Sequence, residues 1–185
     1  IVTGDWSSDV CSSDLRLALS IPVTLGFAYS EFLSGWGVLL LILIACLTDF
    51  LDGKVARAKN TASARGQLFD HSTDFIFVTS GLAGCAFSGL INPYLPVLIL
   101  IAFSQYVIDS YYLYKQKELR MSFLGRWNGI LYFGPLLFLA FSAIKLGKDF
   151  EEFMGLAGSI FAWILTGSTL LSIIDRGLAP LRDSE

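Results

Sequence analysis

The residues best suited to chemistry lie in one stretch, residues 49–74, with the sequence DFLDGKVARAKNTASARGQLFDHSTD. Asp49 and Asp52 are spaced i, i+3, and Asp70 and Asp74 are spaced i, i+4, so each pair shares one face of a helix. Two adjoining helices joined by a short basic segment would direct all four carboxylates toward one spot. Because unshielded carboxylates repel one another and oxygen ligands suit Mg²⁺ or Mn²⁺, we expect these four acids to bind a pair of such ions.

Small residues stand beside these acids. Gly53 follows the second acid directly, Ala56 lies one turn beyond it, and Gly66 lies one turn before the third. Each leaves nearly bare backbone next to a carboxylate, where a flat ligand can lie close. Arg57 adds a forked positive charge that suits phosphate oxygens. We therefore expect Gly53, Ala56, Arg57 and Gly66 to bind a nucleotide pyrophosphate.

The composition indicates which elements position these side chains. Of the 185 residues, 54% are hydrophobic and only 16% are charged, with a net charge of −3. Soluble domains are nearer ~25% charged. This balance excludes a disordered protein, a basic nucleic-acid-binding protein and a disulfide-stapled secreted module. We expect an integral membrane protein that interacts with membrane lipids and has no nucleic-acid partner.

Uncharged stretches predict an all-α fold, a polytopic bundle of six transmembrane helices. A helix needs roughly 20 apolar residues to cross the hydrocarbon core of a bilayer. The stretch 75–108 carries no charge but is too long for one helix, and Asn92-Pro93 divides it into two. The six expected spans are therefore 17–30, 32–48, the two halves of 75–108, 127–144 and 153–174.

The basic residues predict the orientation of these spans. If the first span starts inside the cell, most of the 13 Lys and Arg residues fall on the cytoplasmic side. Only Lys145 and Lys148 fall outside, beside three acids. We expect a protein of a bacterial inner membrane with both termini in the cytoplasm and the acidic site facing the cytoplasm.

Residues 1–15 differ from the rest of the chain. They are polar, rich in Ser and Asp and aperiodic, and residues 5–15, DWSSDVCSSDL, match one translated frame of a common DNA-sequencing adapter. They also lack the basic start and apolar middle of a signal peptide. We expect residues 1–15 to be non-native and residues 16–185 to form the membrane domain, the alternative being a short disordered tail.

The first half of stretch 75–108 carries small residues at four-residue spacing. These are Ser80, Gly84 and Ser88, with Gly81, Cys85 and Gly89 beside them. Such a stripe lets helices approach closely in lipid. We expect it to serve packing within the bundle.

The pattern D-x2-D-G-x2-A-R-x8-G-x3-D-x3-D resembles the signature of the CDP-alcohol phosphatidyltransferases, and this sequence fills every fixed position of it. The helix layout extends the resemblance over most of the chain from residue 16. The resemblance implies a six-helix fold and a homodimer. It also implies transfer of a phosphatidyl group from CDP-diacylglycerol to an alcohol, with release of CMP.

The resemblance also implies a role for each motif residue. The implied ligands of the metal pair are three of the acids: Asp49, Asp52 and Asp70. Asp74 is implied to be a further ligand or the general base that takes the hydroxyl proton of the acceptor. The implied nucleotide contacts are the three small residues and their arginine: Gly53, Ala56, Gly66 and Arg57.

Other positions leave alternatives open. His71 is either a pH-tuned group or an interfacial hydrogen bonder that faces away from the metals. Asp109 either contacts the acceptor or pairs with a basic residue of the loop 115–128. That loop is either an electropositive mouth for a phosphorylated acceptor or ordinary positive-inside charge, with Trp127 at the interface. Arg16, at the head of the first span, resembles a family position.

Two classes of function remain. One is the transferase, with glycerol 3-phosphate or inositol phosphate favoured as acceptor and inositol, serine or another alcohol left open. The other is a non-catalytic cation-binding or transport protein, in which the acids form an ion path or a structural cluster. A transporter would place its carboxylates near mid-membrane, often in broken helices. Here they gather at one boundary beside an arginine and two glycines, which favours the transferase.

Overall fold

The computed structural model describes the backbone of residues 6–59, 64–108 and 123–182. Within these ranges it describes the side chains of residues 14–48, 50–51, 71–108, 125 and 127–178. All elements in the described residues are helices: α1 (Trp6–Ala28), α2 (Gly35–Lys59), α3 (Ala64–Phe87), α4 (Tyr94–Ile108), α5 (Phe123–Leu131), α6 (Phe133–Ser142) and α7 (Lys148–Arg182). The prediction of an all-α fold is confirmed for this part of the chain.

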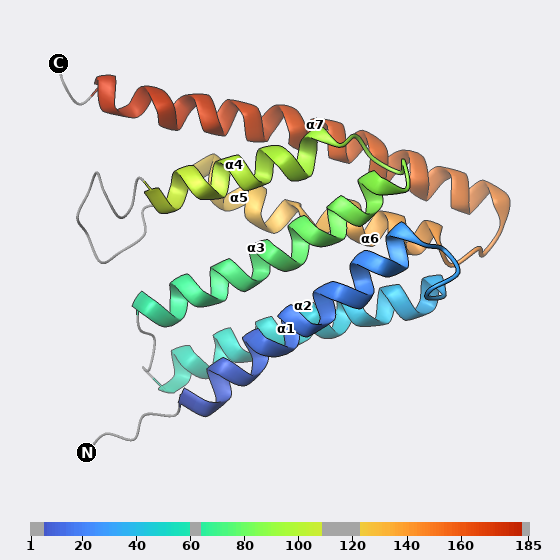
Figure 1. Ribbon diagram of the computed structural model, residues 1–185, viewed down its shortest axis with the longest axis horizontal. Coiled ribbons are helices and arrows are strands. Elements are labelled where there is room, and N and C mark those ends of the chain that lie inside the picture. The colour runs from blue at the N-terminus through green and yellow to red at the C-terminus, as the bar shows by residue number, and fades with distance from the viewer. Residues whose placement is uncertain (1–5, 60–63, 109–122, 183–185) are drawn as a thin grey trace.

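The helices run up and down along one bundle (Figure 1). The start of α1, the end of α2, the start of α3 and the end of α7 lie at the same end of the bundle. We call this the motif end, because residues 49–74 approach it from both sides. The connections α1–α2, α3–α4 and α6–α7 lie at the opposite end.

Each predicted span overlaps a described helix, but the ends of the helices differ from the ends of the spans. Helices α1, α2, α3 and α7 continue beyond the uncharged stretches into charged residues. The predicted span 127–144 contains two helices, α5 ending at Leu131 and α6 beginning at Phe133. Tyr132 between them has helical backbone angles (φ −62°, ψ −22°) and donates its amide hydrogen to the carbonyl of Asn128 at 2.9 Å, so the helical path continues through it. Pro135 has no amide hydrogen to donate to the carbonyl of Leu131, which accounts for the irregularity at this point.

Asn92 and Pro93 divide the long uncharged stretch as expected, and the structure shows how. The Oδ1 atom of Asn92 accepts a hydrogen bond of 3.1 Å from the backbone amide of Leu95, which caps α4. Pro93 lies between the cap and Tyr94, the first residue of α4, and its missing amide hydrogen costs nothing there. Asn92 also donates from Nδ2 to the hydroxyl of Thr166 at 3.2 Å, which ties this turn to α7.

By length and composition, one helix in the described part of the chain, Lys148–Leu178, is long and apolar enough to cross a membrane. Three other described helices are apolar but shorter: Gly35–Thr48, Tyr94–Ile108 and Trp127–Ser142. They coincide with three further expected spans. Six membrane-spanning helices therefore stay a prediction.

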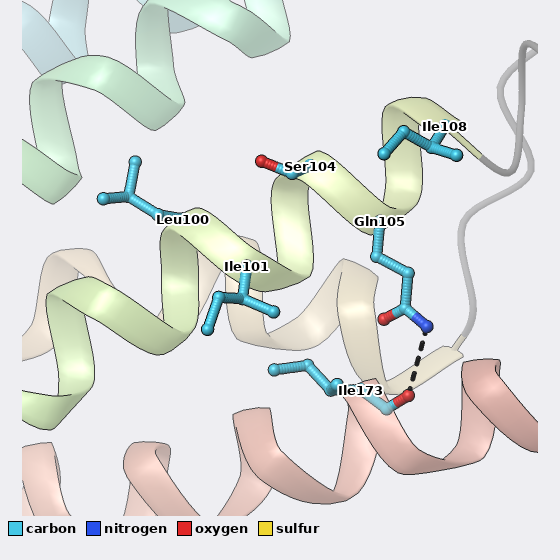
Figure 2. A pocket seen from close by; sticks show the side chains of 6 residues that line it. All are labelled: Leu100, Ile101, Ser104, Gln105, Ile108 and Ile173. Atoms are coloured by element: carbon cyan, nitrogen blue, oxygen red, sulfur yellow. Dashed lines mark hydrogen bonds between the residues drawn. The ribbon is translucent and has the colours of Figure 1, made fainter.

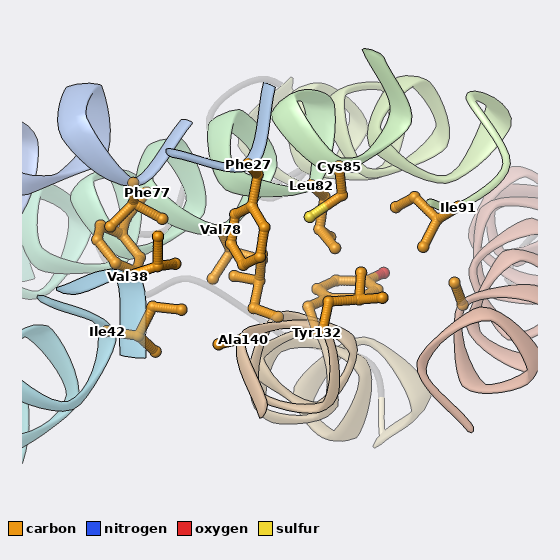
Figure 3. Packing of buried hydrophobic residues seen from close by; sticks show 14 of the residues in the cluster. Phe27, Val38, Ile42, Phe77, Val78, Leu82, Cys85, Ile91, Tyr132 and Ala140 are labelled. Carbon is orange, nitrogen blue, oxygen red and sulfur yellow. The ribbon is translucent and has the colours of Figure 1, made fainter. Parts of the chain in front are cut away.

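The core forms where the helices meet in the middle of the bundle (Figure 3). Phe27 of α1, Val38 and Ile42 of α2, and Phe77 and Leu82 of α3 are all buried there. Ala140 of α6 and Leu165 of α7 belong to the same cluster. Many large apolar side chains remain exposed on the outer faces of α2, α4 and α7, as on a lipid-facing surface.

The small-residue stripe of α3 serves packing, as predicted, in its central part. A Cβ atom built on Gly84 would lie 2.4 Å from the carbonyl oxygen of Thr24 in α1, so only glycine allows this approach of the two backbones. Gly81 and Cys85 are buried beside it. Gly89 and Ser88 are exposed, and Gly89 has a φ of 75° in the turn after the helix.

Candidate active site

The motif lies on two helices. Residues 49–57 fall within α2 and residues 66–74 within α3, each in continuous α-helix. The expected one-turn spacing of Asp49 and Asp52, and of Asp70 and Asp74, is therefore confirmed for the backbone. The side chains of Asp49, Asp52, Gly53, Ala56, Arg57, Gly66 and Asp70 lie outside the described residues, so Asp74 is the motif side chain whose contacts the structure gives.

The two helices place the motif residues at matching depths. Asp49 lies about 15 Å before the end of α2, and Asp74 lies about 15 Å after the start of α3, at 1.5 Å per residue. Asp52 and Asp70 lie at about 10 Å and about 9 Å by the same measure. Since both helices start or end at the motif end (Figure 1), Asp49 and Asp74 are the inner acids and Asp52 and Asp70 the outer acids, each by its distance along its own helix.

The nucleotide residues lie nearer the end of the bundle. Arg57 and Gly66 are each about 3 Å from the helix ends at which α2 and α3 meet the connecting segment. Gly53 lies at the level of the outer pair of acids. Counted from the motif end, each helix thus has the same order of layers along its own axis, with Arg57 and Gly66 outermost and Asp49 and Asp74 deepest.

Asp74 is paired with a basic residue from another helix. The guanidinium Nη1 of Arg16 in α1 donates to Oδ1 of Asp74 and forms a salt bridge with it. The side chain of Arg16 is 1% exposed and that of Asp74 is 27% exposed. An arginine beside a carboxylate stabilises its ionised form, which both proposed roles of Asp74 require.

Neighbouring residues of α3 fix the position of Asp74. Thr73 is buried. The ring of Phe75 stacks on that of Phe103 in α4, with centroids 4.0 Å apart and planes 11° apart. Asp74 is therefore held between a buried residue and a stacked one. His71, one turn earlier, is partly buried, and its two proposed roles stay open.

The described side chains do not include a cluster of three or more His, Cys, Asp or Glu residues that could hold a metal. This finding does not test the predicted site, because three of its four ligands lie outside those side chains. Asp74 itself offers oxygen atoms of the kind that Mg²⁺ and Mn²⁺ bind. The pair of ions stays a prediction.

Residues 115–122 of the loop 115–128 lie outside the described residues, as do Asp109 and the side chain of Arg126, and residues 123–128 belong to α5. Trp127 is 52% exposed, as an interfacial residue should be. Asn128, which sequence analysis treated only as part of this loop, is 3% exposed. Its Oδ1 accepts a hydrogen bond of 2.7 Å from the hydroxyl of Ser168 in α7. Asn128 is thus a packing residue between α5 and α7.

The described residues also form a shallow apolar groove between α4 and α7 (Figure 2). Its lining comes from α4 and one residue of α7: Leu100, Ile101, Ser104, Gln105, Ile108 and Ile173. Gln105 crosses it to donate to the carbonyl oxygen of Ile173 at 3.3 Å. None of these residues belongs to the motif.

Comparison with known families identifies the class of protein. Residues 12–173 match the CDP-alcohol phosphatidyltransferase family, which covers most of the chain and includes both motif helices. The chain belongs to this family. The resemblance predicted from the motif is therefore confirmed. The match begins within residues 1–15, and the proposed non-native origin of that segment stays a prediction.

Three individual relatives share only about a quarter of their aligned residues with this chain. A CDP-diacylglycerol–glycerol-3-phosphate 3-phosphatidyltransferase of Mycoplasma genitalium is 27% identical over 68% of this chain and 52% of its own length. One of the same name from Cereibacter sphaeroides is 27% identical over 86% of this chain and 72% of its own. A cardiolipin synthase (CMP-forming) of Streptomyces coelicolor is 26% identical over 72% of this chain and 60% of its own.

The chain thus spans 52% of the length of the Mycoplasma genitalium relative and 60% of the length of the Streptomyces coelicolor relative. No solved structure matches it. Family membership is shown, whereas the reaction and its acceptor are inferred below.

Proposed function

We propose that this protein is an integral membrane phosphotransferase that moves a phosphatidyl group from CDP-diacylglycerol to an alcohol, in phospholipid biosynthesis. The observation that carries this proposal is the complete family motif on two antiparallel helices, with its acids at matching depths. In the reaction, the hydroxyl oxygen of the acceptor bonds to the phosphatidyl phosphorus while the bond from that phosphorus to the bridging oxygen breaks. CMP leaves with that oxygen.

The motif residues would have different roles according to their distance from the motif end. Arg57, Gly53, Ala56 and Gly66, toward the end of the bundle, would hold the nucleotide and its phosphates. Asp74, in the deepest layer, would accept the proton of the attacking hydroxyl. Its carboxylate is 27% exposed and is paired with the guanidinium of Arg16.

Asp49, Asp52, Asp70 and Asp74 would hold one or two Mg²⁺ or Mn²⁺ ions. Bound there, such ions would neutralise the pyrophosphate and the departing CMP. Phosphoryl transfer depends chiefly on positioning and charge neutralisation, which an acid cluster on two rigid helices can supply.

Glycerol 3-phosphate is the favoured acceptor. Two of the relatives carry this acceptor in their names, and the basic loop 115–128 suits a phosphorylated alcohol. Inositol phosphate fits the same charge argument. A further relative is named as a CMP-forming cardiolipin synthase, so inositol, serine and other alcohols belong in the same test.

The test is CMP release from labelled CDP-diacylglycerol by the purified protein in detergent, with each acceptor in turn. We expect release with glycerol 3-phosphate in Mg²⁺ or Mn²⁺ and its loss in EDTA, with recovery when the ion is restored. Activity that EDTA leaves unchanged would contradict the metal site. Lack of CMP with every acceptor would instead favour the non-catalytic cation-binding or transport protein.

We also propose that the six spans cross a membrane, with both termini and the site in the cytoplasm, and that the protein is a homodimer. The exposed apolar faces of α2, α4 and α7 support insertion in a bilayer. The dimer has only the family resemblance in its favour. Its test is the mass of the purified protein in detergent.

A further inference from the structure

Arg16 is buried although its neighbours in the chain are not. Its side chain is 1% exposed, whereas Asp14 and Leu15 are exposed. Burying an arginine is costly unless its charge is balanced. Its depth in the bundle therefore calls for a fixed anionic partner.

Asp74 is that partner. It lies 58 residues away in the chain, on α3, and receives the Nη1 hydrogen of Arg16. The pair is asymmetric in its exposure, since the arginine is enclosed and the carboxylate is about one quarter exposed. The arginine can thus bind the carboxylate from inside the bundle, while the side chain of Asp74 stays 27% exposed.

The packing of α1 on α3 holds this pair in register. Gly84 of α3 lies directly against the backbone of Thr24, and Gly81 lies within 3.6 Å of Val23, measured from a Cβ atom built on the glycine. Both contacts lie two to three turns from the pair along helices that run in the same direction (Figure 1). The position of Arg16 relative to Asp74 is therefore set by the backbone.

We propose that Arg16 is the positioning residue for Asp74, an inference that rests on the function proposed above. It holds the carboxylate in one orientation before substrate arrives. Its side chain is 1% exposed and its Nη1 is bonded to Asp74, so we assign it to the carboxylate and not to substrate phosphate. This distinguishes it from Arg57, which the motif assigns to the nucleotide.

The test combines kinetics with stability in four proteins: wild type, Arg16→Gln, Arg16→Lys and the matched control Arg176→Gln. Arg176 lies in α7, 5.1 Å from the ring of Tyr106, and outside the motif. We expect Arg16→Gln to lower kcat by about 10- to 100-fold, as misplacement of a reacting group does, with KM for CDP-diacylglycerol changed less than about threefold. Arg16→Lys should recover part of kcat, and Arg176→Gln should keep it.

A thermal-unfolding cycle of Arg16→Gln, Asp74→Asn and the double variant tests the pair without any assay of activity. Either single change leaves one charged or polar partner buried without its counterpart, so both should lower Tm, and the double variant should lose less than the sum. Additive losses would overturn the pairing, even if the wild type proved inactive and the proposed function failed. A raised KM with normal kcat would make Arg16 a substrate ligand instead. Normal kcat and KM in the folded fraction of Arg16→Gln would make it merely structural.

Discussion

At the scale of single residues, Asp74 is the member of the motif whose surroundings are known. It carries a buried arginine on one side and is partly open on the other. A carboxylate that is charged and oriented before substrate binds has less to reorganise during the reaction. The two roles left open for Asp74, metal ligand and general base, both need its negative charge.

Replacing Asp74 by asparagine keeps the shape of the side chain and removes that charge. We expect Asp74→Asn to lower CMP release by at least about 100-fold, since general base catalysis alone contributes about 10²- to 10⁴-fold. Binding of CDP-diacylglycerol should stay largely intact, because the nucleotide residues lie in other layers. The measurements are CMP release per folded molecule and binding of the labelled CDP-lipid.

The neighbouring substitution Ser72→Ala is the control for that experiment. It changes the same part of α3 at a position that the motif leaves open and should keep wild-type turnover. If Asp74→Asn turned over at the wild-type rate with saturating metal, Asp74 could not be the base.

Sequence analysis predicted the motif spacing, because the period of an α-helix converts i, i+3 and i, i+4 into a shared face wherever the helix forms. It did not predict the contact of Arg16 with Asp74. That contact depends on the packing of α1 along α3, and local sequence patterns do not predict which helices pack together. The close approach at Gly84 was visible as a small-residue stripe, but the stripe did not say which helix would use it.

At the scale of elements, the bundle depends on close backbone contacts and on buried polar pairs. Gly84 permits the first kind, between α1 and α3. Tyr132 shows the second, since its hydroxyl lies 2.7 Å from that of Thr169 in α7. The division into α5 and α6 was not predicted, because uncharged length alone takes no account of the missing amide hydrogen of Pro135.

Alanine at Gly84 should destabilise the protein. Its Cβ would lie 2.4 Å from the carbonyl oxygen of Thr24, and a backbone atom cannot move aside as a flexible side chain can. We expect a loss of about 1–3 kcal/mol in the free energy of unfolding, typical of overpacking. Gly167→Ala on α7 is the matched control, because nothing lies within 4 Å of its Cβ position.

Unfolding in mixed detergent micelles measures both glycine variants. Gly167→Ala should be neutral or stabilising by up to about 1 kcal/mol, since alanine favours helix over glycine. Equal stability of the two variants would show that α1 and α3 do not meet closely at Gly84.

Removing the hydroxyl of Tyr132 tests the contact of α5–α6 with α7. We expect Tyr132→Phe to cost about 0.6–1 kcal/mol, the usual net value of one hydrogen bond in water or in a membrane bundle. Thr169 keeps its bond of 2.7 Å to the carbonyl of Leu165, which limits the loss. Tyr29→Phe, at an exposed tyrosine, should cost almost nothing. Equal effects of the two substitutions would contradict the buried contact.

At the scale of the whole molecule, the up-and-down order of helices places the motif residues and most basic residues at one end of the bundle. The end of α2, the start of α3, the start of α1 and the end of α7 all lie at the motif end (Figure 1). Most Lys and Arg residues belong to that end, and Lys145 and Lys148 lie at the other, beside Asp149 and Glu151. The sequence allowed this division to be predicted, because alternation of spans and loops determines which charges share a side.

The charge difference between the two ends predicts a fixed orientation in the cell membrane. Leu146, between α6 and α7, is exposed at the end opposite the motif. With Cys11, Cys46 and Cys85 replaced by alanine, Leu146→Cys should react with a membrane-impermeant maleimide on intact cells. A cysteine added after Glu185 should react only after permeabilisation, since the basic end is retained in the cytoplasm. The reverse pattern would place the motif outside the cell, away from cytoplasmic CDP-lipid. Labelling of both sites on intact cells would contradict the prediction that they lie on opposite sides of the membrane.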